Sequence, residues 1–427
     1  MRWDSAVSDA EKRPFASRYA LAFIFITMLV DTIGLGIIIP VAPKIIAELS
    51  GYAANDPYAM SHAAQWGGWL FFVYALMQFL CAPLIGNLSD RFGRRPVLIA
   101  SLLALGVDYV ITGLAPTIAW LFIGRFLSGI AGASYTTVNA YIADITPPEK
   151  RAASFGLTGA AFSVGFILGP ALGGTLGAYG SRVPFFVAAG LSLLNALFGM
   201  FVLRESLSVE HRRKFEAWRA NPLGALQALR RFPGIFLLIA VMVLMRLAHD
   251  SNPAVFSYYV YAKFHWTPQM VGYSLMTVGA LMAVVYGFLV RIVVPRIGET
   301  ASVYLGLLCG AAGFAGYAFA TRSWMMFAWM VPFALMGFVM PALSAIMSKL
   351  VGPREQGELQ GALACVGSLT SIVAPPLLTN LFSYFSSGRA PVYFPGAAFL
   401  AASLCLILAA LVFTRVRTTA PALQPAE

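Results

Sequence analysis

Long apolar runs separated by short polar segments are the feature that most limits how this chain can fold. Of its 427 residues, 59% are hydrophobic and 11% are charged, and the mean hydropathy is +0.76. A soluble domain does not bury so much apolar surface, whereas a run of about 18 apolar residues crosses a bilayer as a helix. Several runs exceed that length. The chain is therefore expected to be an all-α membrane protein.

Counting the apolar runs predicts twelve membrane-spanning helices. They are expected at residues 18–44, 62–87, 95–114, 117–142, 152–178, 183–203, 233–260, 269–292, 299–320, 324–349, 357–384 and 393–414. The first run contains Asp31 and lacks a small-residue cleavage site, so we interpret it as a retained span. The runs predict a tail at 1–17, a six-helix bundle at 18–203, a linker at 204–232, a second bundle at 233–414 and a tail at 415–427.

Lys and Arg residues gather in alternate loops, which predicts that both termini face the cytoplasm. We therefore interpret the net charge of +11 as a topology signal, and no nucleic-acid partner is expected. The four cysteines lie in apolar segments without metal-ligand spacing, so no metal and no cofactor are expected. In the linker, Asn221 and Pro222 precede an apolar and basic stretch at 223–231. This stretch predicts either an amphipathic helix on the membrane surface or, equally well, a plain basic linker.

The two halves of the chain repeat with a shift of 205 residues and no gap. Matched positions carry the same small or ring-constrained residue, as in the pairs Gly93 and Gly298, Ala115 and Ala320, Gly132 and Gly337, Pro148 and Pro353, and Pro170 and Pro375. Glycine and proline at matched positions indicate matched backbones, so we predict a duplicated six-helix unit. Parallel repeats of this kind place a substrate site between the halves near the bilayer midplane.

A polar cluster lies between the second and third apolar runs. It contains Asp90, Arg91, Arg94 and Arg95, with Gly86 and Gly93 beside them. Charges cost several kcal/mol in hydrocarbon, so this stretch is expected to form a tight hairpin outside the membrane. The tendency of basic residues to remain in cytoplasmic loops accounts for the arginines of this cluster. It does not account for Asp90 or for the two glycines. We predict that Asp90 and Arg94 form an ion network with Asp144 that closes the cytoplasmic side.

Asp31 lies 13 residues from Arg18 and 13 from Lys44, the basic residues that bracket the first predicted helix. At about 1.5 Å per residue, its carboxylate is expected roughly 20 Å from each end of the helix, near the midplane. A carboxylate there is rare, and it binds or releases a proton as solvent access changes. Asp31 is therefore predicted to be a proton-coupling group, with a capped structural aspartate as the weaker alternative.

Asp108 and Arg125 flank the predicted turn near Ala115 and are expected at similar depth on antiparallel helices. Two interpretations are equally supported. The residues form a structural ion pair, or Arg125 is shared between Asp31 and Asp108 in different conformations.

The seventh predicted span carries a third polar cluster, formed by Arg246, His249 and Asp250 and followed by Asn252 and Pro253. Arg246 and Asp250 are one helical turn apart and can pair. So many polar groups in a spanning helix indicate that this face lies against water or protein rather than lipid. We predict that the cluster contacts substrate or relays its proton.

The stretch GNLSDRFGRRPV at 86–97 resembles the loop between spans two and three of the major facilitator superfamily. DTIGLGIIIP at 31–40 is similar to the first span of its tetracycline-efflux drug:proton antiporters, and the similarity continues through 124–129 and 165–174. This resemblance implies two six-helix repeats whose first, fourth, seventh and tenth helices line a cavity. It implies proton coupling at Asp31 and Asp108, and an antiporter-type helix motif formed by Gly165, Gly169, Pro170, Gly173 and Gly174.

The resemblance implies a monomeric exporter of small amphipathic compounds in a bacterial inner membrane, driven by protons. The alternatives are a proton-coupled uptake symporter for a nutrient or siderophore, and a receptor or enzyme without transport activity. Met282 and Gly310 stand where the tetracycline exporters carry a His and an Asp. A further set of aromatic, amide and methionine residues is expected to line the substrate cavity or, by a stronger prior for most of them, to be core: Tyr74, Gln78, Tyr258, Tyr259, Tyr261, Tyr286, Met330, Met336 and Met340.

Overall fold

The structure is a computed structural model that describes residues 13–52, 56–213, 235–352 and 355–416, and these residues contain helices and no strand. The helices of the first half are α2 (Arg13–Ile38), α3 (Ala42–Leu49), α4 (Ala59–Phe92), α5 (Arg94–Leu114), α6 (Ile118–Gly132), α7 (Tyr135–Ile145), η1 (Pro148–Lys150), α8 (Arg151–Leu176), α9 (Val183–Val202) and η2 (Val209–His211). The expected tail at 1–17 lies outside the described residues up to residue 12. From Arg13 the chain is already helical.

The helices of the second half begin after the linker. They are α11 (Phe236–Phe264), α12 (Pro268–Val284), η6 (Val285–Leu289), α13 (Val290–Ile297), α14 (Glu299–Phe319), α15 (Ser323–Leu335), η7 (Met336–Phe338), α16 (Val339–Lys349), α17 (Gln356–Ser386) and α18 (Ala397–Phe413). The predicted amphipathic helix at 223–231 and the end of the C-terminal tail lie outside the described residues.

The helical segments match the predicted spans. In the described part of the chain, nine continuous helical stretches are long and apolar enough to cross a membrane, and α2 with α3 adds a tenth as a pair bent by 49°. Helix α18 is apolar but has 17 residues. Helix α11 has 29 residues, and its polar cluster lowers its hydropathy. Together these segments account for the predicted all-α membrane fold.

The predicted duplication is visible in the backbone. Helices α5 and α14 have 21 residues each, and both of their ends differ by the 205-residue shift. The fourth and tenth spans are both broken at the matched place, where Gly132 corresponds to Gly337. Helix α6 ends at Gly132 and α7 begins three residues later at Tyr135, whereas α15 passes through the single turn η7 into α16.

The turn between the second and third spans is tighter than expected. Apolar counting predicts that the second helix ends near residue 87, whereas α4 remains helical to Phe92 and α5 begins at Arg94. Gly93 alone reverses the chain, with φ of 105°, a conformation that a residue with a Cβ rarely adopts. In this last polar turn of α4, Ser89 Oγ donates to the Gly86 carbonyl and Asp90 pairs with Arg94. Gly86, in contrast, makes no close approach, since a Cβ added there would lie 4.0 Å from Thr136 Oγ1.

The chain forms two compact units. The first comprises residues 1–51, 73–221 and 267–276, and the second comprises residues 52–72, 222–266 and 277–427. Helices α4 and α12 are therefore each divided between units. The first part of α4 belongs to the second unit because Gly67 and Gly68 leave room there for Tyr258 and Thr379.

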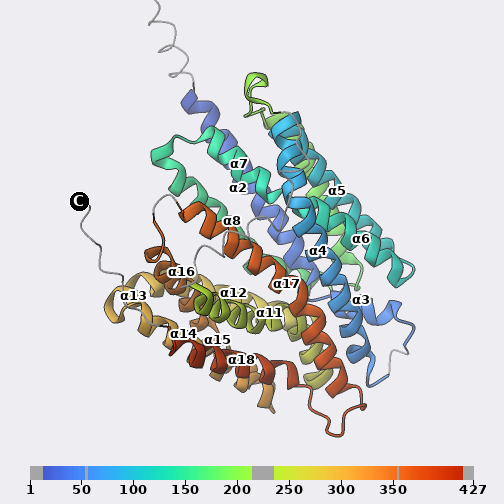
Figure 1. The fold of residues 1–427 in the computed structure, drawn as a ribbon. Coiled ribbons are helices and arrows are strands. Elements are labelled where there is room, and N and C mark those ends of the chain that lie inside the picture. The colour runs from blue at the N-terminus through green and yellow to red at the C-terminus, as the bar shows by residue number, and fades with distance from the viewer. Residues whose placement is uncertain (1–12, 53–55, 214–234, 353–354, 417–427) are drawn as a thin grey trace, which may run out of the picture. The chain divides into compact units, whose positions relative to one another are not determined.

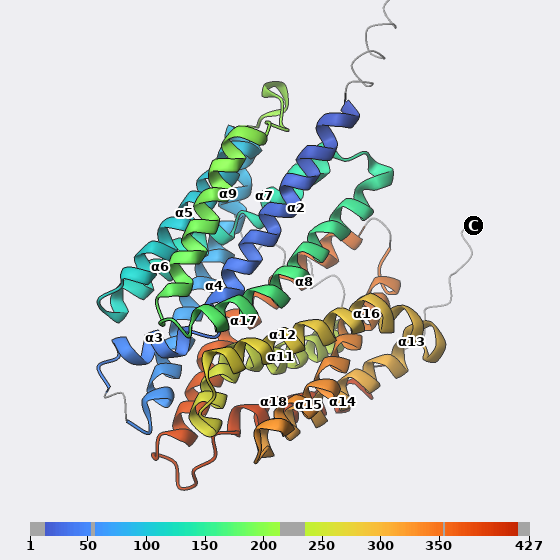
Figure 2. The same cartoon turned by 180° about the vertical axis from the view of Figure 1, so that it is seen from behind.

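Within the first unit, α2 packs against α7, α8 and α9, and α5 packs against α6, α7 and α9 (Figures 1 and 2). Within the second unit, α11 packs against α17 and α18, and α14 packs against α15, α16 and α18 (Figure 1). The first unit has an aliphatic and aromatic core around Phe23, Ile24 and Tyr141. The second has an aromatic core, in which Phe314, Tyr317 and Phe399 contact one another.

Candidate functional site

Asp31 lies on α2 in the first unit. Its Oδ1 is buried and makes no hydrogen bond among the described residues. Tyr109 is a neighbour of this helix, because a Cβ added at Gly34 would lie 3.1 Å from Tyr109 Oη. The Tyr109 hydroxyl also lies close enough to Asp31, Asp108 and Arg125 to interact with their charges. The first unit therefore gathers Asp31 and Asp108 around one tyrosine.

Asp108 and Arg125 form an ion pair between α5 and α6. Arg125 Nη2 lies 3.0 Å from Asp108 Oδ2, and the Asp108 side chain is fully buried. Thr112 Oγ1 donates to Asp108 Oδ1 at 3.2 Å. The helices approach closely because Gly124 has no Cβ, which would meet the Asp108 carboxylate. The paired arrangement is thus one of the two predicted alternatives, and the exchange of Arg125 with Asp31 stays a prediction.

Tyr74 and Gln78 hold α4 to the end of α6. Gln78 Nε2 donates to the Gly132 carbonyl at 3.3 Å and to Tyr74 Oη at 3.4 Å. A Cβ at Gly132 would lie 2.9 Å from Tyr74 Oη, so this glycine permits the contact. Tyr74 also lies within electrostatic range of Arg125, Asp108 and Asp31. Both residues therefore lie at the polar cluster of the first unit.

The polar turn after α4 contains the predicted ion contacts. Arg94 Nη1 lies 2.5 Å from Asp90 Oδ1, and Arg94 Nε lies 3.3 Å from Asp144 Oδ2 at the end of α7. Arg94 is buried, with 9% of its surface exposed, and its Nη1 also donates to Ser89 Oγ at 2.6 Å. One arginine thus joins the end of α4 to the end of α7.

Glu205 is a member of this turn that the sequence analysis did not identify. Its carboxylate accepts hydrogen bonds from the backbone N–H groups of Arg94 at 2.8 Å and Arg95 at 3.2 Å. An acidic side chain at a helix N-terminus is favourable because it satisfies free N–H groups and complements the helix dipole. The only sequence signal was an acidic residue directly after the sixth span.

The two outer arginines of the turn have other partners. The Arg91 guanidinium lies 5.0 Å from the centre of the Phe92 ring. Arg95 Nη2 donates to the Met200 carbonyl at 2.6 Å. They therefore anchor the turn without joining the Asp90, Arg94 and Asp144 network.

The glycines of α8 pack mainly against α2. Cβ atoms added at Gly165 and Gly169 would lie 2.7 Å from Thr32 Cβ and 2.8 Å from Gly36 Cα, respectively, and one at Gly173 would overlap the Ile37 carbonyl. The motif meets the second half of the sequence near its end, where Gly174 and Pro170 contact Gly272 of α12. Gly165, Gly169 and Gly173 thus lie on α2, whereas Cβ atoms added at Gly156 and Gly159 would meet nothing within 4 Å.

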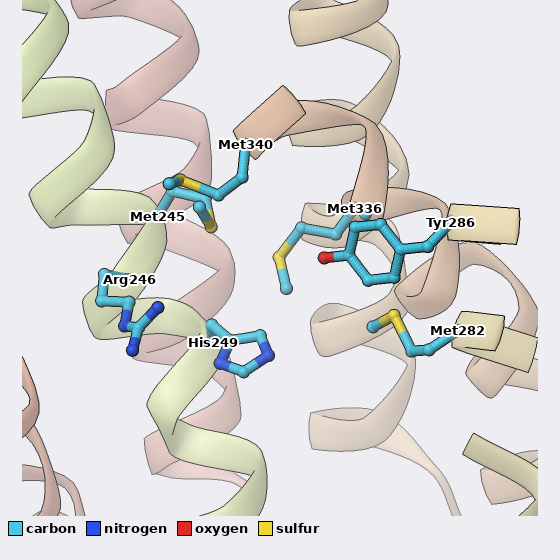
Figure 3. Close-up of a pocket in the computed structure, with 8 residues that line it drawn as sticks. Met245, Arg246, His249, Met282, Tyr286, Met336 and Met340 are labelled. Carbon is cyan, nitrogen blue, oxygen red and sulfur yellow. The ribbon is translucent and has the colours of Figure 1, made fainter. Parts of the chain in front are cut away.

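The seventh-span cluster opens onto a pocket in the second unit (Figure 3). The pocket has a volume of about 60 Å³. Its lining comes from α11, α12, η6, η7 and α16 and consists of Met245, Arg246, His249, Met282, Tyr286, Met336, Gly337 and Met340. Three of the residues expected either here or in the core, Tyr286, Met336 and Met340, therefore line it. Met330, Tyr258, Tyr259 and Tyr261 are buried core residues.

Asp250 is the buried member of this cluster. Ser371 Oγ of α17 donates to Asp250 Oδ2 at 2.8 Å, and His249 Nδ1 lies 3.4 Å from Asp250 Oδ1. Arg246 Nε lies 3.9 Å from Asp250 Oδ1 and 3.5 Å from Ser371 Oγ. The sequence analysis did not identify Ser371, which is 121 residues away from Asp250 along the chain.

Comparison with known proteins gives consistent matches. The sequence matches the Major Facilitator Superfamily over residues 24–323 and, in an overlapping second match, 251–427. It is 40% identical over 371 residues to the tetracycline resistance protein, class C, of Escherichia coli, which covers 87% of this chain and 91% of that protein. It is 31% identical over 370 residues to multidrug resistance protein 2 of Bacillus subtilis, with coverage of 84% and 88%. A solved bacterial homologue of the human lysosomal transporter Spinster, inward-facing and unoccupied, has a TM-score of 0.77 at 19% identity, covering 94% of this chain and 97% of that chain.

Proposed function

The chain belongs to the Major Facilitator Superfamily, and on that premise we propose that it exports amphipathic drugs in exchange for protons. It is an integral membrane transporter of small molecules rather than an enzyme. The relatives named for tetracycline and multidrug resistance match most of its length. We extend drug efflux from those proteins to this chain, with tetracycline as the first compound to test.

The observation that carries the proposal is the unpartnered carboxylate oxygen of Asp31. A buried charge without a partner is costly, and protonation removes that cost. Asp31 therefore favours a bound proton in this arrangement and releases it once water or a cation reaches the carboxylate. A side chain with these properties is suited to carry the coupled proton.

Arg125 is the cation that can take the place of the proton. In this arrangement it neutralises Asp108 at 3.0 Å, while Asp31 Oδ1 has no hydrogen-bond partner among the described residues. Movement of the guanidinium toward Asp31 would stabilise the deprotonated carboxylate and leave Asp108 to be protonated. Proton release at one aspartate is thereby linked to a rearrangement at the other.

The remaining parts of the proposal concern the whole transporter. The chain is a monomer in the bacterial inner membrane with both termini in the cytoplasm. Its bundles at 18–203 and 233–414 expose the substrate to one side of the membrane at a time. The network of Asp90, Arg94 and Asp144 stabilises closure on the cytoplasmic side. Substrates enter the cavity from the cytoplasm and leave when the opposite side opens.

Proton exchange can be tested in everted membrane vesicles whose interior is acidified by respiration. Adding tetracycline should release protons from vesicles that contain the wild-type chain, seen as recovery of a quenched pH-sensitive dye. Asp31→Asn should give no recovery at equal abundance. Asp56→Asn is the matched control, because Asp56 lies in the connection before α4 and accepts a hydrogen bond from the Tyr58 N–H. Full recovery with Asp31→Asn would exclude Asp31 as the proton carrier.

A further inference from the structure

The pocket of the second unit presents positive charge. The side chains of Arg246 and His249 are 44% and 42% exposed, whereas that of Asp250 is 11% exposed. Among the residues that line the pocket in the described part of the chain, none is acidic. A ligand that enters the pocket therefore meets the guanidinium and the imidazole before it meets the carboxylate.

Asp250 only partly neutralises this charge. Its Oδ2 accepts the hydrogen bond from Ser371, and its Oδ1 lies nearer to His249 than to Arg246. The 3.9 Å separation from Arg246 Nε is too long for the charge-assisted hydrogen bond of about 2.8 Å that a tight pair makes. The guanidinium thus retains donors for an acceptor on a ligand.

Apart from Arg246 and His249, the lining of the pocket is largely apolar, and Met282, Met336 and Tyr286 lie across the pocket from these two residues (Figure 3). Met245, Met282, Met336 and Met340 surround the space, and the Tyr286 hydroxyl points into it from the side opposite Arg246 and His249 (Figure 3). Methionine side chains are unbranched and polarizable, so they adapt to apolar bodies of different shape. A cavity of about 60 Å³ is smaller than the roughly 300–1,000 Å³ of pockets that hold drug-sized ligands. These methionines must therefore turn aside as a ligand enters.

We propose that this pocket selects amphipathic anions. The carboxylate, sulfonate or enolate of the compound accepts hydrogen bonds from Arg246, and its apolar body lies on the four methionines. A lipophilic cation of the same size leaves Arg246 without an acceptor and adds like-charge repulsion. The inference rests on the proposed transport function and names the substrate class of that transporter.

Binding of two charge-matched probes tests the inference. The full-length chain, purified in an uncharged detergent, is dialysed to equilibrium at pH 7.5 against pyrene-1-butyrate or pyrene-1-butylamine, with protein-free micelles subtracted. The probes share one apolar body and differ in charge. Wild-type protein should bind the butyrate at least about tenfold more tightly than the amine, the size expected for one charged hydrogen bond. Equal binding, or tighter binding of the amine, would overturn the proposal without any variant.

Variants then locate the preference. Arg246→Gln should weaken butyrate binding by about tenfold and, by removing the like-charge repulsion, tighten amine binding, and Arg246→Glu should reverse the order of the two probes. Arg291→Gln is the matched control, because Arg291 lies on α13, is exposed and does not line the pocket. If Arg246→Gln does not fold, Met282→Glu places a carboxylate on the other wall and should weaken the butyrate selectively. A selective loss with Arg291→Gln would contradict the assignment.

The binding assay uses no proton gradient. A failure of the anion preference can therefore be distinguished from a failure of the proposed drug:proton exchange. An anion preference together with an inactive vesicle assay would leave the pocket in place and remove proton exchange. Proton exchange without an anion preference would support the proposed function and overturn the anion-selective pocket.

Discussion

Lys349 Nζ lies 2.7 Å from Glu299 Oε1, and this contact repeats, with the charges exchanged, the one between Arg94 and Asp144. Each residue of the second pair follows its counterpart by the same 205 residues. The glycine before each helix, Gly93 or Gly298, has positive φ. The duplication therefore preserves the turn and the ion contact while reversing the polarity of the contact.

The two ion pairs should contribute differently to stability. Arg94 is buried and also bonds Ser89, so Arg94→Ala should lower the free energy of unfolding by about 2–4 kcal/mol. Lys349 is 69% exposed, so Lys349→Ala should cost less than about 1 kcal/mol. Unfolding of the purified variants in detergent compares them directly. Equal losses would show that the second pair is as important to the fold as the first.

The two turn glycines provide a second matched comparison. Both Gly93→Ala and Gly298→Ala strain the backbone, since φ is 105° and 82°. A Cβ at Gly93 would also displace the Glu205 carboxylate, whereas a Cβ at Gly298 meets nothing within 4 Å. Gly93→Ala should therefore lower the apparent melting temperature more. Restoration of Gly93→Ala by Glu205→Ala would support this reason, and identical melting of the two single variants would refute it.

Two glycines of α8 provide a test of its close packing on α2. A Cβ at Gly169 would lie 2.8 Å from Gly36 Cα, whereas one at Gly159 has nothing within 4 Å. Gly169→Ala should lower stability by about 1–3 kcal/mol through overpacking, and Gly159→Ala should lower neither stability nor transport. Drug export should fall with Gly169→Ala. A neutral Gly169→Ala would mean that α2 and α8 can separate without loss.

Removing one partner of the buried pair should be worse than removing both. Arg125→Met leaves the fully buried Asp108 carboxylate without its cation, which should cost about 3–5 kcal/mol of stability. Adding Asp108→Asn should recover most of that loss, since an amide needs no counterion and still accepts the hydrogen bond from Thr112. A double-mutant cycle of unfolding measures the coupling. Additive losses would argue against a tight pair.

Much of the fold can be predicted from sequence because glycine, proline and apolar length act locally. The bounds of α5 and α14 follow from such local signals, whereas the breaks near Gly132 and Gly337 lie inside stretches predicted as continuous helices at 117–142 and 324–349. The continuation of α4 to Phe92 was missed because apolar counting cannot tell a polar helical turn from a loop. The resemblance to the major facilitator superfamily is confirmed.

The site residues that the sequence did not reveal have partners that lie far away along the chain. Glu205 is 111 residues from Arg94, and Ser371 meets Asp250 only because α17 packs against α11. Neither residue has a local pattern that indicates its partner. The polar cluster on α11 was visible because charge inside an apolar run is itself a signal. The sequence alone could not indicate which side chains of this cluster face a pocket, because the pocket forms only where α12 and α16 pack.

The most direct test of the central claim is tetracycline uptake into proteoliposomes with an imposed pH gradient. With an acidic interior, proton efflux through the wild-type chain should drive tetracycline uptake above the level of protein-free liposomes. Asp31→Asn should lose this uptake while retaining exchange of labelled for unlabelled drug without a gradient. Uptake by the wild type only when the interior is alkaline would indicate symport, and undiminished gradient-driven uptake by Asp31→Asn would contradict the account.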